Sequence, residues 1–146
     1  MNILIVLISV FILLEGLNVA LLYFHPSSTS GNAMGAFNAL EKAKKDPEIY
    51  ALVKYLINWV AGTKLIFIGL LVVIIFTAEN NTLVFAVIAL IISISTFYWR
   101  LYPAIKSMDK DNQINPKGYS KTLAIMITVF ILAFITGLVI HLLSKP

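Results

Sequence analysis

The chain of 146 residues contains no cysteine, which excludes disulfides, thiolate metal sites and cysteine nucleophiles. Charged residues are also scarce, at 12% of the chain, whereas soluble domains average about a quarter. Hydrophobic residues make up 60% of the chain, and the mean hydropathy is +0.92. This composition indicates an integral membrane protein rather than a soluble domain.

Four apolar runs are long enough to cross a bilayer, which takes about 20 mainly apolar residues in a helix. A bilayer core offers no water to the backbone, so such runs should be helices. We predict an all-α integral membrane protein, a four-transmembrane-helix bundle of up-down-up-down topology that forms one transmembrane domain over residues 1–146. The predicted helices are 2–24, 47–77, 83–102 and 119–143.

Basic residues gather in the two long connections, 25–46 and 103–118, and at their borders. They are Lys42, Lys44, Lys45, Lys54, Arg100, Lys106, Lys110, Lys117 and Lys121. The short connection 78–82 has none, and the C-terminal tail has only Lys145. Because positively charged loops stay on the cytoplasmic side, we expect both long loops in the cytoplasm and both termini outside. We expect the protein in a prokaryotic cytoplasmic membrane.

A short surface helix is predicted at 36–45, within the first long connection. Phe37, Leu40 and Ala43 lie on one side of it. This pattern fits either an anchor on the lipid surface or a lid over the inner mouth of the bundle.

Two apolar runs carry a full charge well inside, Glu15 in the first and Lys64 in the second. Tyr23 and Trp59 mark the membrane interface, and the helical rise places both charges on the order of 10 Å from it. Because consecutive helices run antiparallel, we expect Glu15 and Lys64 to make contact inside the bundle. An isolated charge at that depth costs several kcal/mol unless it is paired.

Three interpretations of this pair are open. In the first, Glu15 and Lys64 form an ion pair that fixes the register of two helices. In the second, Lys64 extends to the headgroups and leaves a protonated Glu15 against Asn18. In the third, both belong to a site for a ligand, an ion or a proton. Ionisable groups inside a membrane are by default candidates for such a functional site. No catalytic triad, metal motif or phosphate loop occurs, so we predict no catalytic residue, no metal and no cofactor.

The outer half of the apolar runs offers few polar residues beyond Ser9, Thr136 and His141. The other polar residues that we single out lie in the middle or in the same half as the pair. They are Asn18, Asn58, Ser93, Thr96 and Arg100. With Glu15 and Lys64 they form the predicted site, a pocket open to the cytoplasm and closed outside. A channel would need polar groups along its whole length. Asn58 lies about 120° around the helix from Lys64, so one helix face cannot hold both.

One face of the third run carries a stripe of small and polar residues, namely Ala86, Ala89, Ser93, Thr96 and Arg100. Such stripes usually mark close helix packing, which we favour here over a cavity lining. Ala133 and Gly137 in the last run form a second small pair, for which we also expect packing.

A glutamate in the first of four helices, here Glu15, resembles the small multidrug-resistance transporters, in which such a residue exchanges protons for cationic drugs. The resemblance implies a proton-exchanging role for Glu15. It covers one helix, and the long first loop, the opposing Lys64 and the missing aromatic-glycine signature of the third helix depart from that family. We treat it as an analogy of mechanism.

We predict a small membrane protein whose cytoplasm-facing polar pocket binds or transports a small molecule, an ion or a proton. Glu15 would accept a proton with Lys64 as its counter-charge, and Arg100 would attract anionic groups. The alternatives are a structural or accessory subunit that binds partner helices or lipid and, third, a membrane-embedded lipid-modifying enzyme. Expected partners are membrane lipid, a small ligand or ion and further copies of the chain, but no nucleic acid.

Overall fold

The computed structural model describes residues 2–31 and 33–144, so Lys145 lies outside the described residues. The protein is 82% helical, and the described residues contain no strand. Within these described residues, four helical spans are long and apolar enough to cross a membrane. They are α1 (Ile3–Phe24), α3 (Pro47–Thr77), the span Asn80–Lys110, and α6 (Tyr119–Leu143). The prediction of an all-α protein with four apolar membrane-length helices is confirmed.

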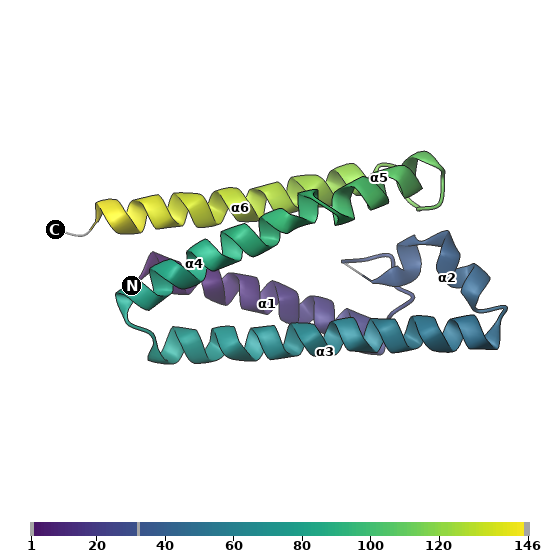
Figure 1. Cartoon of the computed structure of the whole chain (residues 1–146), viewed down its shortest axis with the longest axis horizontal. Coiled ribbons are helices and arrows are strands. Elements are labelled where there is room, and N and C mark those ends of the chain that lie inside the picture. The colour runs from purple at the N-terminus through teal and green to yellow at the C-terminus, as the bar shows by residue number, and fades with distance from the viewer. Residues whose placement is uncertain (1, 32, 145–146) are drawn as a thin grey trace.

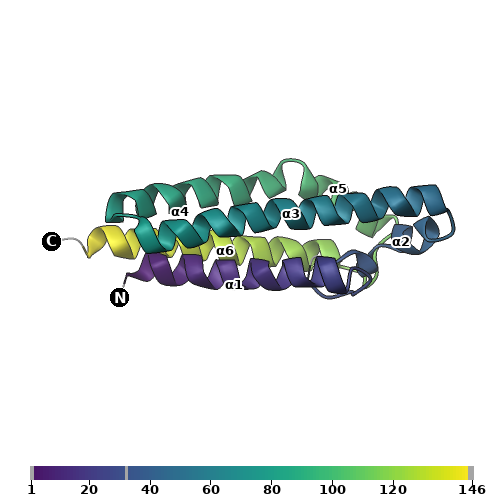
Figure 2. The same cartoon turned by 90° about the horizontal axis from the view of Figure 1, so that it is seen from below.

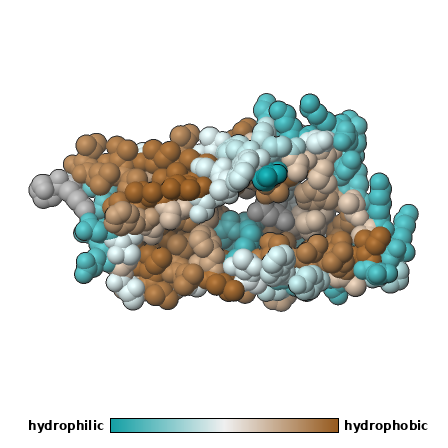
Figure 3. Space-filling model, in the orientation of Figure 1, coloured by the Kyte–Doolittle hydropathy of each residue, from teal (hydrophilic) through white to brown (hydrophobic). Residues whose placement is uncertain are grey.

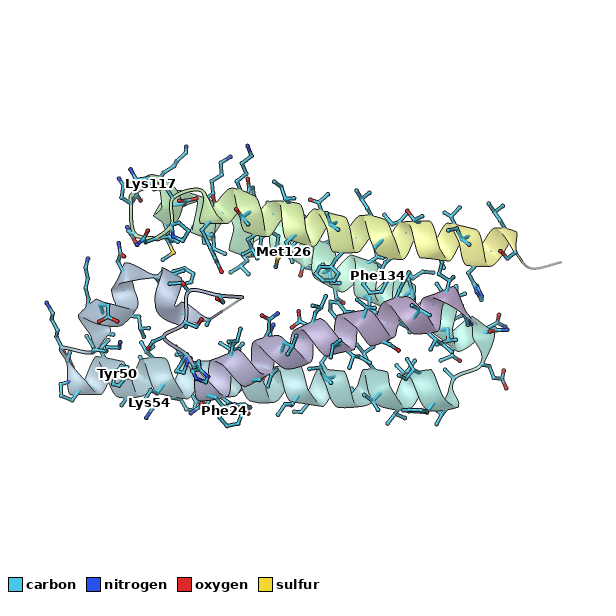
Figure 4. The ribbon with its side chains drawn as sticks, turned by 180° about the vertical axis from the view of Figure 1, so that it is seen from behind. Phe24, Tyr50, Lys54, Lys117, Met126 and Phe134 are labelled. Carbon is cyan, nitrogen blue, oxygen red and sulfur yellow. The ribbon has the colours of Figure 1, made fainter. Side chains whose placement is uncertain are left out.

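The four spans lie side by side and alternate in direction, as Figure 1 shows, and Figure 2 shows the same bundle from below. The start of α1, the connection between α3 and α4, and the end of α6 gather at one end, which we call the turn end. Both long connections lie at the opposite end, which we call the loop end. Figure 4 places the side chains of Lys54 and Lys117 at the loop end.

The start of α3 follows from local chemistry. The Asp46 carboxylate accepts hydrogen bonds from the backbone N–H groups of Glu48 and Ile49 at 3.0 and 3.2 Å, and Pro47 occupies the first helical position. These residues satisfy or remove the donors that a helix start leaves free. With 31 residues, α3 is roughly 46 Å long and exceeds a hydrocarbon core of about 30 Å.

The third span is broken, which corrects the predicted single helix 83–102. It begins as α4 (Asn80–Ser95), tightens into the 3-10 helix η2 (Thr96–Tyr98), and resumes as α5 (Leu101–Lys110) inside the predicted loop 103–118. Pro103 explains the break, because its ring would clash with the Trp99 carbonyl of a continuous helix. Proline is tolerated in the first turn of α5, where its missing N–H has no helical acceptor.

The turn end is closed by a core drawn from all four spans. Its buried members are Leu4, Ile8, Phe11, Leu71, Leu83, Val87, Leu90 and Phe134. The Phe11 ring meets Phe67, Phe130 and Phe134 edge-on at 5.7–6.1 Å between centroids, and Figure 4 shows Phe134 between α6 and α1. A Cβ on Gly137 would collide with the Leu7 side chain, so the close packing expected at Gly137 is confirmed.

At the loop end the first connection folds back over the bundle. It contains the 3-10 helix η1 (Met34–Ala36) and α2 (Asn38–Ala43), and we call residues 33–43 the lid. The lid buries Ala36, Leu40 and Ala43. Its Phe37 forms an antiparallel bridge with Ile114 of the second connection. These contacts favour the lid interpretation over a lipid-surface anchor.

The second connection is fastened to α6 by Asp109. The Asp109 carboxylate accepts hydrogen bonds from the backbone N–H groups of Gly118 and Ser120 at 3.0 and 3.1 Å, and from the Ser120 hydroxyl at 2.6 Å. It therefore caps the start of α6 from a neighbouring helix.

Candidate functional site

A cavity of about 730 Å³, which we call the polar cavity, lies between α1 and α3 on one side and the broken span and α6 on the other. Six of the seven predicted site residues line it, namely Glu15, Asn18, Lys64, Ser93, Thr96 and Arg100. Its volume falls within the roughly 300–1,000 Å³ of small-molecule pockets. Figure 3 shows a recess in the side of the bundle with hydrophilic residues inside it and hydrophobic surface toward the turn end.

Glu15 and Lys64 meet on the floor of this cavity. The Lys64 Nζ donates to the Glu15 Oε2 at 2.5 Å, and the two side chains are 24% and 18% exposed. The predicted contact is confirmed. The interpretation in which Lys64 extends away to the headgroups is wrong, because the carboxylate holds the ammonium between α1 and α3. A role in helix register and a role in ligand binding are both compatible with this pair.

The broken span supplies the opposite wall. Ser93 is in the last turn of α4, Thr96 opens η2, and Arg100 precedes α5. The Thr96 hydroxyl donates to the Ser93 carbonyl oxygen at 2.6 Å, so it satisfies part of the disturbed backbone. Polar side chains from before, within and after the break thus line the same cavity.

The stripe on the third span does not pack as predicted. The buried face of α4 consists of Leu83, Val87 and Leu90, and Ala89 is exposed. Ser93, Thr96 and Arg100 instead line the polar cavity, which is the alternative that we favoured less. Large side chains, rather than the small residues of the stripe, therefore form the buried face of α4.

Arg100 gives the cavity an excess of positive charge. Its guanidinium lies over the Trp99 ring, 5.2 Å from the centroid. Among the described residues, the two ion pairs are Glu41–Lys44 and Glu15–Lys64, so Arg100 has no carboxylate partner. The lining thus contains one carboxylate and two cations. A cavity of this charge attracts anions.

Asn58 is the predicted site residue that lies outside the polar cavity. It is exposed on α3 and lines none of the cavities described here. The helical angle between Asn58 and Lys64 already separated the two faces. Asn58 is therefore removed from the candidate site.

A second cavity of about 490 Å³ adjoins the first toward the loop end. The two cavities share the lining residues Lys64, Phe97, Leu101 and Ile127. Apart from Lys64 and the Tyr119 hydroxyl its wall is apolar, and the lid contributes Met34 and Phe37. Sequence reasoning missed this apolar cavity, because ordinary apolar residues of several helices form it and none of them carries a distinguishing signal.

The segment before the lid approaches the site through Gly31. Gly31 has a φ of +58° and lines the polar cavity, and a Cβ there would lie 2.6 Å from the Asn18 Oδ1. The Tyr119 hydroxyl donates to the Gly31 carbonyl oxygen at 3.2 Å. Glycine is required here both for the left-handed backbone and for the close approach to α1.

At the C-terminal end of α2, a hydrogen bond to the Glu41 carboxylate raises the pKa of Lys44.

The chemistry available at this site is binding and proton transfer. Within residues 2–31 and 33–144, no group of three or more His, Cys, Asp or Glu side chains could hold a metal ion. The chain matches no known protein family, curated protein or solved structure. The site itself must therefore carry any statement about function.

Proposed function

We propose that this protein is a multi-pass membrane protein that binds a small ligand in the polar cavity, with its loop end in the cytoplasm. The observation that supports this function is the convergence of six polar residues from three spans on one cavity. Polar groups are costly inside a membrane and usually face a bundle interior or a water-filled space. A purely structural bundle needs no cavity of this size.

The proposed orientation rests on the distribution of basic residues. Both long connections lie at the loop end, as Figure 1 shows, and they contain or border nine of the eleven Lys and Arg residues. Membrane proteins keep such loops in the cytoplasm. A prokaryotic cytoplasmic membrane remains our expectation.

Glu15 and Lys64 would couple protons to ligand binding. While Glu15 is ionised, it neutralises Lys64 at 2.5 Å. A proton on Glu15 removes that negative charge and frees the Lys64 ammonium for an anionic ligand. Transport would also require the packed core of the turn end to open, so binding is the function that we propose first.

The absence of cysteine permits a clean test of the cavity. Single-cysteine variants Ser93→Cys and Ile92→Cys differ by one position on α4, and Ile92 is 63% exposed outside the cavity. In neutral lipid vesicles, a neutral water-soluble maleimide should label Ser93→Cys about tenfold faster, because thiolates form in wet surroundings and not in lipid. Equal rates at the two positions would contradict a wet, ligand-accessible cavity.

The accessory-subunit alternative predicts a different response to Glu15→Gln. Under the binding function, this variant keeps its size on gel filtration and loses the pH dependence of Ser93→Cys protection by ligand. Under the accessory function, the same variant changes its oligomeric state or loses partner helices. The Lys54→Gln variant, at an exposed position of the same α3 helix as Lys64, serves as a control for the loss of a charge.

A further inference from the structure

We propose that the ligand of the polar cavity is a membrane phospholipid with an anionic headgroup, which enters through the side of the bundle. Its phosphate would bind at Arg100 and Lys64 while its acyl chains stay in the bilayer. This inference rests on the proposed function and specifies its ligand.

The position of the recess decides the route of entry. Figure 3 views the bundle across its helix axes, and the recess opens on that side face. In a membrane this face meets lipid. Toward the loop end the polar cavity adjoins the apolar cavity, whose wall includes the lid residues Met34 and Phe37. The lateral opening is therefore the route that we propose, and the mouth toward the cytoplasm stays a prediction.

The rim of the opening is apolar although its interior is polar. Leu14, Leu17, Trp99 and Leu101 line the cavity and are nevertheless 39–72% exposed. An exposed apolar rim around a charged interior suits a ligand with a polar head and hydrocarbon tails. Acyl chains can lie along these side chains, whereas a water-soluble ligand gains nothing from them.

The charge of the interior selects the headgroup. Arg100 is exposed, has no carboxylate partner among the described residues, and stands beside Trp99 on the rim. Guanidinium groups match the geometry of phosphate oxygens with paired donors. Tryptophan and arginine are also typical of the headgroup level of a membrane. Arg100 is therefore the residue that would hold the phosphate, and Lys64 is the second cation within the same cavity.

Protection of Ser93→Cys from maleimide tests the inference in intact bilayers. Vesicles of phosphatidylcholine are compared with vesicles that contain phosphatidylglycerol, and each rate is divided by that of Ile92→Cys in the same membrane. We expect phosphatidylglycerol to slow Ser93→Cys about fivefold, as a charge-assisted headgroup contact of about 1 kcal/mol would. Arg100→Gln should abolish this protection, and Arg100→Lys should restore part of it.

Lys106→Gln is the matched control for Arg100→Gln. Like Arg100, Lys106 is exposed and lies over an aromatic ring, 5.7 Å from the Tyr102 centroid. Unlike Arg100, it lines neither cavity. It should keep the protection. Gel filtration of each variant checks that it is folded. Equal protection by both lipids, or protection by glycerol 3-phosphate in solution, would overturn the anionic-lipid ligand.

The two proposals fail in different ways. If Ser93→Cys reacts faster than Ile92→Cys but no lipid slows it, the wet cavity stands and the lipid ligand is wrong. If Ser93→Cys is no more reactive than Ile92→Cys in neutral vesicles, both proposals are wrong.

Discussion

The turn end and the loop end are built from the same four spans, yet an apolar core joins all four at the turn end, whereas two cavities lie between them toward the loop end. At the turn end, each span contributes apolar side chains to one core around Phe11 and Phe134. Toward the loop end, the spans enclose the polar cavity and the apolar cavity, and the lid contributes to the wall of the apolar cavity. Both halves contain long apolar helices, so hydrophobicity alone does not distinguish them. The difference coincides with the partly buried pair Glu15–Lys64 and with the break before Pro103.

This contrast separates the residues that hold the bundle together from those available for function. Packing in a membrane depends on close contact, since lipid is as apolar as the side chains themselves. The turn end supplies that contact and allows the rest of the bundle to remain open. Three sets of variants test this contrast between the two ends.

The largest effect is expected on the floor of the cavity. Glu15→Lys places two cations together where an ion pair stood, and it should destabilise the protein by roughly 3 kcal/mol. The double variant Glu15→Lys with Lys64→Glu restores the pair in reverse and should recover most of that loss. Unfolding by sodium dodecyl sulfate, followed by circular dichroism, measures both. A double variant as unstable as the single one would mean that the pair does not join α1 to α3.

A similar or slightly smaller effect is expected in the closed half. Phe134 is 2% exposed, and Phe134→Ala should destabilise the protein by about 3 kcal/mol through lost contacts around Phe11. Phe85→Ala is the control, because Phe85 is 70% exposed on α4 and should change stability little. The same unfolding assay compares them. Equal losses would show that the turn end is no more tightly packed than the outer surface.

The smallest effect is expected at the lid. Gly31→Ala and Gly118→Ala each force alanine into a left-handed backbone, with φ of +58° and +84°, at about 1 kcal/mol. Only Gly31→Ala also crowds the Asn18 side chain, whereas a Cβ at Gly118 meets nothing within 4 Å. We expect Gly31→Ala alone to loosen the lid, seen as faster maleimide labelling of a Met34→Cys reporter. Similar labelling in both variants would argue against crowding of the Asn18 side chain as the cause of the loosening.

Much of the fold could be predicted from the sequence, because membrane-spanning helices depend on local composition. The length of the apolar runs gave four spans, and the Asp46-Pro47 start of α3 follows from capping alone. The contact between Glu15 and Lys64 was also predictable, since aromatic residues mark depth and consecutive helices run antiparallel. Each of these features depends on a few neighbouring residues.

The rest depends on tertiary placement. The break at Thr96–Tyr98 was missed because Pro103 lies near the end of an apolar run, where proline can either stop a helix or start the next one. Small residues on the third span were assigned to packing because a stripe has the same pattern whether it faces a helix or a void. The apolar cavity required knowledge of how far the spans diverge, and no local signal contains that distance.

The break in the third span has a consequence for the surrounding bilayer. No side chain caps the first turn of α5, and the N–H groups that begin a helix need acceptors. Hydrocarbon supplies none, so irregular backbone persists only beside water or other polar groups, such as those at the headgroup level that Trp99 and Arg100 mark. Hydration of the recess would make the insulating layer thinner on one flank of the protein. The voltage across the membrane would then fall mainly over the sealed half, and the two opposed charges would sense little of it.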